Sequence, residues 1–463
     1  MLNPSTPFPG LRPAHLLAVA GASCLLIYGW LAWLSRQDQP VDLSLFLLAA
    51  LICAGLGLIV VWGYSKQQLQ IPFFWILISA ILFRAAGVFG EPLFEDDFYR
   101  YLWDGYRTAL SGDPYSFPPS HYFASENVPI IFEPILSKIN YPDVATVYGP
   151  VCQWIFAAAY TIAPGQIWPL QLFAAMADIG ILLLLRFLTQ HNALLLYAWS
   201  PLLIKEFAFT AHPDVLAVFM VMVAIWLRCF ERAWLVGVFL GLAIGIKVFA
   251  IVLVPFLLLF RGDFKRSAAA ATALLFTLLL ITLWFGTFVI WVPEGLRVMA
   301  ESWLFNAPVY ILLTTFLPFN MVKTILLVLF FGFAARLLYQ QYQAPGFEAK
   351  NPAAFVPSMM RADLLFGAFL LCTPVLNPWY LIWILPFAVL HPSRWAWTAS
   401  VAVLLSYVTA LSGGDPSTEI YRLPNAILIL EFGLIAAAML MDWKRPLNPT
   451  GSDKGVSAVR IQG

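Results

Sequence analysis

The chain has 463 residues, of which 61% are hydrophobic and 11% are charged, with a formal net charge of +1. So small a net charge indicates neither a nucleic-acid partner nor an acidic one. Repeated runs of about eighteen or more apolar residues, each long enough to cross the hydrocarbon layer of a bilayer, exclude an ordinary soluble domain. The composition therefore predicts an all-α polytopic transmembrane helical bundle, surrounded by membrane lipid.

In chain order, about fourteen apolar segments are candidate membrane-spanning helices. The first is too long for the core of a signal peptide and lacks a cleavage site, so it is interpreted as an uncleaved anchor. The candidate segments are 15–34, 43–63, 72–90, 168–188, 192–208, 214–230, 233–247, 248–261, 267–291, 320–341, 362–376, 378–390, 395–411 and 424–441.

Lysine and arginine residues collect in alternate loops, which sets the predicted orientation in the cell (inner) membrane. The bias holds if runs 233–261 and 362–390 are each split into a helical hairpin and if segment 150–163 lies at the interface. Both termini are then cytoplasmic, and the active-site loops lie on the extracytoplasmic side. The predicted organisation is a two-helix extension (1–71), a catalytic membrane module (72–390) with an acidic loop (91–166), C-terminal helices (391–443) and a disordered cytoplasmic tail (444–463).

Two other sequence patterns have simple structural explanations. The five cysteines are widely spaced without a CxxC pair, which is typical of small core residues and not of a disulfide framework or metal site. Gly237, Gly241 and Gly245 recur at intervals of four, which predicts close packing of one helix against another.

The stretch GEPLFEDDFYRYLWDGYRTALSGDPYSFPP, residues 90–119, concentrates charge next to an apolar run. From Phe94 to Ala109 its apolar and charged residues both follow helical spacing on different faces. The pattern predicts an amphipathic helix on the outer membrane surface, with its aromatic side chains in lipid. The turn residues SGDPY end this helix, and Pro118-Pro119 prevents its continuation.

The acids of this helix have two interpretations. Glu95 and Asp96 could cap the helix N-terminus, while Arg100 could form ion pairs with Asp97 or Asp104. Alternatively, Asp96 and Asp97 are functional, because three consecutive carboxylates repel one another beside the bilayer and exceed what a cap needs. Such crowding raises proton affinity and suits a general base or a cation site.

Six stretches occur in the order FEDDFYRYLWDG, DPYSF, INYPDVATVYGP, FTAHPDVLAVF, LGLAIGIKVFAIVLVP and TPVLNPWYLIWILP. Together they resemble the GT-C superfamily of polyprenyl-phosphate-sugar-dependent glycosyltransferases, particularly bacterial mannosyltransferase-like members. The resemblance implies an acidic extracytoplasmic loop with interfacial helices and a cavity open to the bilayer. It also implies a polyprenyl-phosphate-linked sugar donor, with mannose as the sugar, a glycan or lipid acceptor, and inversion at the anomeric carbon.

The same resemblance assigns residues to roles. It places the catalytic base at Asp96, with Asp97 beside it, and matches Lys247 to a recurrent lysine that would contact the donor phosphate. Arg84 is a second candidate for that contact from its position alone, near the outer end of the span before the acidic loop, and Glu95 and Arg100 are candidate substrate-binding residues. The chain departs from the family at Tyr148-Gly149-Pro150, where relatives often carry Tyr-Pro-Pro.

A second polar group, KEFAFTAHPD, falls at the outer mouth between two predicted spans. His212 and Asp214 are candidates for sugar binding, although Asp214 could equally cap the next helix. In LNPWYLIW, Trp379 and Tyr380 could form an interfacial aromatic belt, or could stack on the sugar or guide the lipid.

Three function classes fit a polytopic membrane protein with these features. A secondary transporter or a lipid or glycolipid flippase should show charges near the bilayer midplane and a repeated half, whereas here the charges collect at one face. A noncatalytic scaffold would not need the acidic cluster. The glycosyltransferase is therefore favoured. The sequence requires no metal, although Glu95, Asp96 and Asp97 together offer carboxylate ligands for a divalent cation.

Overall fold

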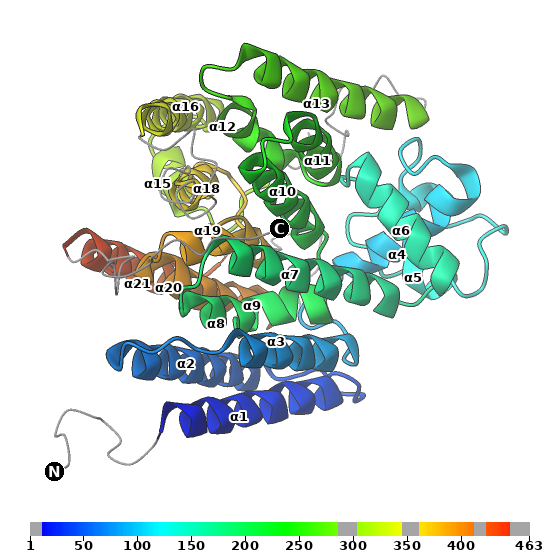
Figure 1. Cartoon of the computed structure of the whole chain (residues 1–463). Helices are drawn as coiled ribbons and strands as arrows, with labels where there is room; N and C mark the ends of the chain where they lie inside the picture. The colour runs from blue at the N-terminus through cyan, green and yellow to red at the C-terminus, as the bar shows by residue number, and fades with distance from the viewer. Residues whose placement is uncertain (1–11, 286–302, 345–360, 412–422, 445–463) are drawn as a thin grey trace, which may run out of the picture.

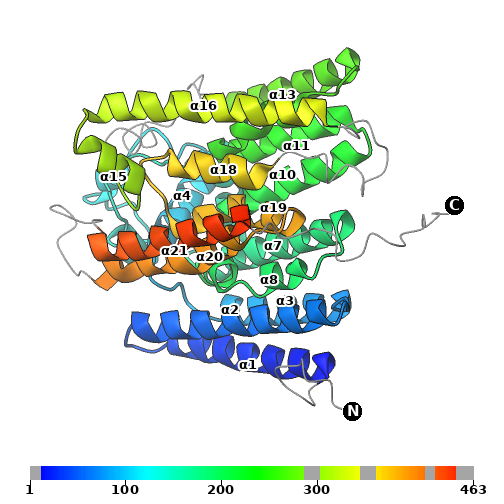
Figure 2. The ribbon, with the colours of Figure 1, turned by 90° about the vertical axis from the view of Figure 1, so that its left-hand side faces the viewer.

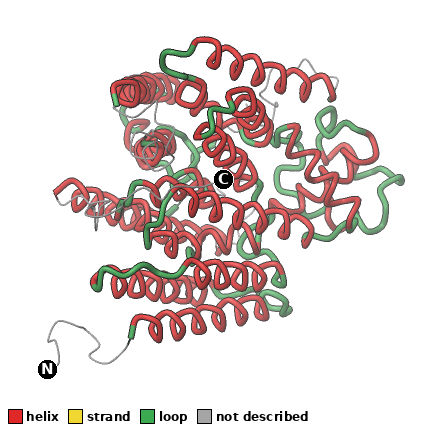
Figure 3. Tube along the Cα trace, in the orientation of Figure 1, coloured by secondary structure: helices red, strands yellow, loops and turns green. Residues whose placement is uncertain are grey.

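The computed structural model describes residues 12–285, 303–344, 361–411 and 423–444. Within these residues the secondary structure is helical (Figure 3), apart from an isolated bridge between Phe305 and Val375. The predicted all-α class is therefore confirmed for the described part of the chain. The predicted tail, beyond Lys444, lies outside the described residues.

Six described helices are long and apolar enough to cross a membrane. Large apolar side chains on their outer faces, such as Leu275 at 65% and Phe331 at 64% exposure, suit contact with lipid and not with water. Figure 2 shows α1, α2, α13 and α16 running nearly parallel, as expected for helices that share one bilayer. The six are α1 (Pro13–Leu34), α2 (Leu43–Lys66), α7 (Trp168–Leu188), α13 (Phe264–Trp284), α16 (Phe319–Gln343) and α21 (Asn425–Lys444).

The other predicted spans are also helical, but they are shorter or broken. One bent pair, 193–209 with 214–229, turns by 114° and would count as a seventh span. The total of fourteen crossings therefore stays a prediction. These elements are α3 (Phe73–Val88), α8 (Ala193–Ala198), α9 (Pro201–Leu203), η2 (Ile204–Phe209), α10 (Asp214–Cys229), α11 (Ala233–Ile246), η3 (Val248–Leu253), α12 (Val254–Leu258), α18 (Ala362–Leu371), η4 (Pro378–Trp383), α19 (Leu385–Leu390), α20 (Arg394–Ala402) and η5 (Val403–Leu411). A further short helix, α15 (Pro308–Thr314), lies in a segment predicted as a loop between spans.

The first of the two predicted helical hairpins is present. Helix α11 ends at Ile246, and Lys247 has an extended backbone that starts the reversal. Arg228, which precedes α11, donates a hydrogen bond to the Leu259 carbonyl after α12, at 3.4 Å. The chain from 233 to 261 therefore returns to the end of the bundle where it began, and Lys247 lies at the opposite end.

Close helix packing at the glycine stripe is confirmed. A Cβ atom at Gly237 would lie 2.0 Å from the Ala270 carbonyl oxygen of α13, which no side chain could tolerate. A Cβ atom at Gly245 would lie 2.6 Å from Val151. Glycine at these positions lets α11 contact α13 and the segment around Val151 directly.

The segment between α3 and α7 folds into a compact group at one end of the bundle (Figure 1). Leu102, Trp103 and Tyr106 of α4 are buried in a small apolar core with Phe132 and Ile135. The prediction that the aromatic face of this helix enters lipid was therefore wrong, because the following loop folds back over it. The elements are α4 (Asp97–Ser111), η1 (Pro119–Tyr122), α5 (Glu133–Leu136) and α6 (Pro150–Ile162).

Candidate active site

The acidic cluster lies where α4 begins. Glu95, Asp96 and Asp97 are each half-buried, and one carboxylate oxygen from each lies within 4.8 Å of the others. Asp96 occupies the N-cap position, yet its side chain makes no capping hydrogen bond. Helix capping therefore does not explain these acids, and their oxygen ligands would suit a hard divalent cation.

The protonation of the cluster differs from that of exposed acids. Burial raises the pKa of Glu95 well above its ordinary value and also raises the pKa of Asp96. For Asp97, burial and then the neighbouring Asp96 charge raise the pKa to about 6. A carboxylate of this kind is mostly ionised at neutral pH and still takes a proton readily, which suits a general base.

Each aspartate of the cluster has a partner from the loop between α5 and α6. The side-chain amide of Asn140 donates to the Asp96 carboxylate, and the Tyr148 hydroxyl donates to Asp97 Oδ2 at 3.3 Å. Each of the two carboxylates is therefore held by a different side chain of that loop.

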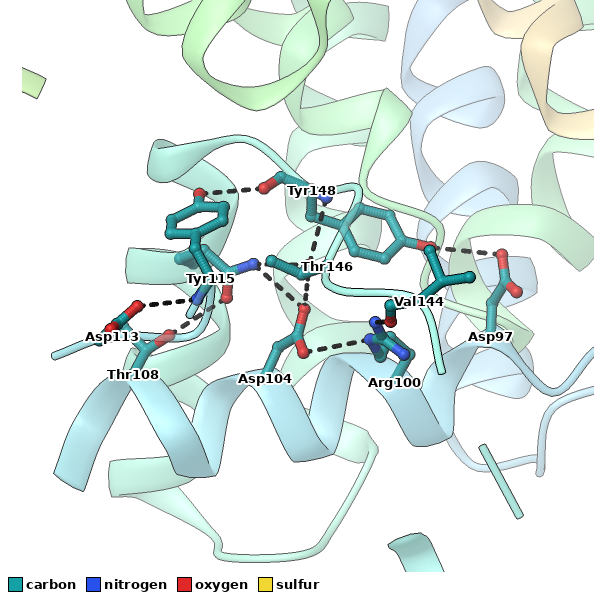
Figure 4. A network of polar contacts seen from close by, with 10 residues as sticks. Asp97, Arg100, Asp104, Thr108, Asp113, Tyr115, Val144, Thr146 and Tyr148 are labelled. Atoms are coloured by element: carbon teal, nitrogen blue, oxygen red, sulfur yellow. Dashed lines mark hydrogen bonds and ion pairs between the residues drawn. The ribbon is translucent and has the colours of Figure 1, made fainter. Parts of the chain in front are cut away.

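A buried network holds that loop against α4, as Figure 4 shows. Asp104, which is 2% exposed, accepts hydrogen bonds from Thr146 and from Gln153 Nε2, the latter at 3.1 Å. Arg100 Nε lies 3.3 Å from Asp104 Oδ1, and another Arg100 nitrogen donates to the Val144 carbonyl. The Arg100–Asp104 ion pair expected from the helical spacing is confirmed. The positive charge of Arg100 is therefore neutralised within this network.

Gly149, where the chain departs from the family pattern, has a steric reason to be glycine. A Cβ atom there would lie 2.3 Å from the Gly245 carbonyl oxygen at the end of α11. A proline at this position would therefore collide with α11 in this structure. The close contact brings Tyr148 next to the reversal that carries Lys247.

Lys247 faces the acidic cluster from α11. Its Nζ lies 3.2 Å from Asp214 Oδ2, and its charge acts on Asp97. Asp214 is fully buried and accepts a second bond from Trp383 Nε1 at 3.0 Å. The ammonium group also lies 4.9 Å from the centre of the Tyr380 ring. Since the Lys247 side chain keeps 18% exposure, it is the reachable member of the pair and Asp214 positions it.

His212 lies behind these groups. It is fully buried, and its ring stacks on Trp379 with centroids 3.8 Å apart. Its Nδ1 lies 2.8 Å from the Tyr101 hydroxyl and its Nε2 lies 3.4 Å from Glu206. Two predicted site residues, His212 and Trp379, therefore lie in direct contact. Because the histidine is fully buried, no face of its ring is open to a substrate.

A model of the alpha-(1->6)-mannopyranosyltransferase family, described as its N-terminal domain, matches residues 14–262. That match covers more than half of the chain and includes the acidic cluster, His212, Asp214 and Lys247. The chain belongs to this mannosyltransferase family. Comparison with curated proteins and with solved structures gives no match. The protein is thus a mannosyltransferase-like glycosyltransferase with the apolar helices of a membrane protein.

Three further residues support the site of this mannosyltransferase: the sequence placed Lys205 and Glu206 in the second polar group without a role, and sequence reasoning missed Tyr407. Lys205 Nζ lies 3.1 Å from Glu206 Oε2 and 2.5 Å from the Tyr407 hydroxyl, which donates to Glu206 Oε1 at 2.6 Å. These three residues lie near Glu95, where burial raises the pKa of the carboxyl group and the positive charge of Lys205 partly opposes that increase. The signal was the pair Lys205-Glu206 inside an apolar run, whereas Tyr407 is distant in sequence and gave none.

Backbone strain adjoins the site. Among the described residues other than glycine, positive φ occurs at Phe94, Tyr141 and Ala211, which directly precede or follow Glu95, Asn140 and His212. Such conformations cost about 1–3 kcal/mol each and persist where surrounding contacts impose them. The strain indicates that surrounding contacts, and not local preference, hold the backbone of these three segments. The other such residues are Gln68, Glu231 and Asn306.

Arg84, the second predicted phosphate contact, lies elsewhere. It is 2% exposed in α3, pairs with Asp178 at 2.8 Å and donates to the Ala198 carbonyl at 2.5 Å. Its charge is therefore neutralised inside the helix bundle, and we assign it no contact with substrate.

Proposed function

We propose that this mannosyltransferase is of the GT-C type and moves mannose from a polyprenyl-phosphate donor to an acceptor hydroxyl. The observation that carries the proposal is that half-buried Asp97, poised to accept a proton, lies within the electrostatic influence of Lys247, which is itself held by an ion pair with Asp214. Transfer from a lipid phosphate needs these two charges in one place, one for the attacking hydroxyl and one for the departing phosphate.

The geometry favours Asp97 over Asp96 as the base. Asp96 is held by the Asn140 amide, whereas Asp97 faces Tyr148 and the charge of Lys247. In the proposed step, the acceptor hydroxyl gives its proton to Asp97 while its oxygen bonds to the anomeric carbon. The bond from that carbon to the phosphate oxygen breaks on the opposite side, so the configuration inverts.

Lys247 would hold the donor phosphate. Its partner Asp214 is fully buried and fixed by Trp383, so the ammonium group has a defined position before substrate arrives. Tyr380 beside it is buried, and its ring helps to hold the ammonium group in place. Asp96 and Glu95 complete the negative side of the site, where a divalent cation would bind through their carboxylate oxygens.

The membrane arrangement completes the proposal. Lys247, at the turn of the first hairpin, and the acidic cluster, after α3, belong to the same end of the bundle. We place that end outside the cytoplasm of the inner membrane, with about fourteen crossings and both termini inside, from the distribution of basic residues. A lipid-linked donor can then keep its chain in the bilayer while its sugar reaches the site.

The donor class is tested with purified protein in liposomes, radiolabelled polyprenyl-phosphate mannose and octyl α-mannoside as the acceptor probe. The proposal predicts a labelled disaccharide glycoside whose new linkage is α by NMR when the donor is β-linked. Transfer from a nucleotide-linked mannose in the absence of the lipid donor would contradict it, and so would a β-linked product.

A further inference from the structure

Helix α21 carries a buried acid with an unfilled hydrogen-bonding position. Glu431 is 1% exposed, and its Oε1 accepts a hydrogen bond of 3.0 Å from the side-chain amide of Asn306, which is also 1% exposed. The second oxygen of each side chain, Glu431 Oε2 and Asn306 Oδ1, is buried without a hydrogen-bond partner in the described part of the chain. Since buried oxygens are normally paired, two unpaired ones on side chains in contact require an explanation.

An ionised carboxylate would satisfy neither oxygen. Glu431 lies in a helix long and apolar enough to cross the bilayer, where an unpaired charge is costly. The ionised group also has no hydrogen to donate, so Oε2 and Asn306 Oδ1 would both stay unpaired. A second component, either a proton or a cation, is therefore needed at this position.

The elements packed against α21 bring no cation to Glu431 within the described residues. Arg394 of α20 pairs with Asp442 at 2.9 Å, about three helical turns along α21 from Glu431. The other titratable groups on the packed elements are uncharged at neutral pH. They are Tyr407 of η5, Tyr310 of α15 and Cys372, the last two in the small apolar core that begins at Ala307.

One proton on Glu431 accounts for both oxygens. A protonated carboxyl group has an O–H donor at one oxygen and an acceptor at the other. With the proton on Oε2, Glu431 donates to Asn306 Oδ1 while it continues to accept from Asn306 Nδ2. The acid and the amide then form a closed pair with two hydrogen bonds, and neither group carries a charge.

Asn306 is the point at which α21 meets a segment that leads to the site. Its backbone φ of 49° lies in the left-handed region, which asparagine adopts more readily than most residues. The preceding residue, Phe305, donates from its backbone to the Pro374 carbonyl at 2.9 Å and accepts from the backbone of Leu376 at 3.0 Å. A contact that fixes Asn306 therefore also fixes residues 374–376.

Helix η4 begins two residues after this pairing, at Pro378. Its Trp383 donates to Asp214, and Asp214 is the partner of Lys247. A displacement of residues 374–376 would therefore be passed through η4 to the groups that hold the Lys247 ammonium group.

We propose that Glu431 is protonated in the folded protein and forms with Asn306 a closed acid–amide pair that positions η4 beside Lys247. Glu431 and Asn306 are positioning residues, because they reach the site only through residues 374–376 and η4. The effect on mannose transfer rests on the proposed function, whereas the proton on Glu431 does not.

The proposal fixes how stability depends on pH. A glutamate in the unfolded chain is ionised above about pH 5, so folding takes up one proton from water. The wild-type protein should then lose stability as the pH rises, with the unfolding equilibrium constant increasing about tenfold per pH unit from this group. Glu431→Gln cannot ionise, and its amide can fill both hydrogen bonds to Asn306, so the variant should lack this contribution.

The test compares wild-type and Glu431→Gln protein in detergent, unfolded with urea between pH 5 and 7 and followed by tryptophan fluorescence. The ratio of their unfolding equilibrium constants should change about tenfold per pH unit in favour of the variant, while the other titrating groups cancel. The infrared spectrum of wild type should contain a protonated-carboxyl band that the variant lacks. The matched control is Glu133→Gln, at an exposed glutamate, which should behave as wild type in both measurements.

Two results would overturn the proton on Glu431. One is a stability difference between wild type and Glu431→Gln that does not change with pH. The other is wild-type stability that rises with Na⁺, K⁺ or Mg²⁺ concentration and loses this dependence in Glu431→Gln, since a metal cation would then occupy the position.

Exchanging the acid and the amide tests the pair itself. Asn306→Asp alone places two acids in contact and should lower stability increasingly as the pH rises. The double variant Asn306→Asp/Glu431→Gln again has one acid and one amide of the same lengths, so it should recover most of the loss. A double variant no more stable than Asn306→Asp would contradict the closed pair.

The connection to the site is measured by activity. Glu431→Leu removes the pair, so kcat/KM for polyprenyl-phosphate mannose should fall about tenfold, whereas Glu431→Gln should keep it within about twofold. Full transfer by folded Glu431→Leu protein would overturn the positioning role. If wild-type protein transfers no mannose from the lipid donor, the proposed function fails instead, and the unfolding comparison still decides the protonation of Glu431.

Discussion

Two regions of this protein bury charge, and they do so in opposite ways. In the bundle, Arg84 and Asp178 neutralise each other, Tyr197 donates to Asp178 at 2.5 Å, and Arg84 also reaches a backbone carbonyl. At the start of α4, like charges are crowded together, and burial raises their pKa values. The first arrangement ties α3 to α7, whereas the second keeps carboxylates ready for a proton or a cation.

The largest expected effect is on activity in the acidic cluster. Asp97→Asn removes the proposed base with little change in shape, so transfer should fall by about a thousandfold. Protein yield and thermal midpoint should stay at or above the wild-type values, because a crowded, partly buried charge is removed. The control is Asp143→Asn, an exposed aspartate of the same segment as Asn140, which should keep full activity. Near-normal transfer by Asp97→Asn would show that the base lies elsewhere.

Substitution within the Arg84–Asp178 pair of the bundle should instead cause a large loss of stability. Asp178→Leu leaves the Arg84 guanidinium buried without its carboxylate, which costs about 3–5 kcal/mol. The double variant Arg84→Met/Asp178→Leu removes both charges and should recover much of the lost thermal midpoint in detergent. If the single and double variants have the same midpoint as wild type, this pair does not stabilise the fold.

Lys247 shares a feature with each of these regions, because it forms an ion pair with buried Asp214 and its own side chain is still partly exposed. Lys247→Gln should raise the KM for the lipid donor by about tenfold with a smaller change in the KM for octyl α-mannoside, because a charge-assisted contact to phosphate is lost. Adding Asp214→Asn removes the unpaired buried acid and should restore stability but not donor affinity. Lys247→Arg, which keeps the charge, serves as the control. Equal increases in both KM values would argue against a phosphate contact.

Local sequence pattern predicted the helices well. Apolar runs predicted the helical segments. The small-residue spacing at Gly237 and Gly245 predicted close helix packing, which the structure shows between α11, α13 and Val151. The reversal at Lys247 followed from the basic residues, because a charge bias records which loops share a side. These features depend on composition and short spacing, which the chain carries locally.

Long-range contacts could not be predicted in the same way. Arg84 was a second candidate for the donor phosphate because it lies near the outer end of its span, and nothing local reveals its pair with Asp178, which is far away in sequence. Tyr407 meets Glu206 across the fold, and Asn140 meets Asp96 only because the loop folds back over α4. The same folding-back explains why the aromatic side chains of α4 pack in protein and not in lipid.

The pH dependence of mannose transfer tests the central claim most directly. With Asp97 as the base and a pKa of about 6, kcat/KM should be level above pH 7 and fall about tenfold for each unit well below 6. Asp97→Glu should move this acid limb, whereas the Asp143→Asn control should not. Transfer that stays level down to pH 4.5, or an acid limb unmoved by Asp97→Glu, would contradict the account.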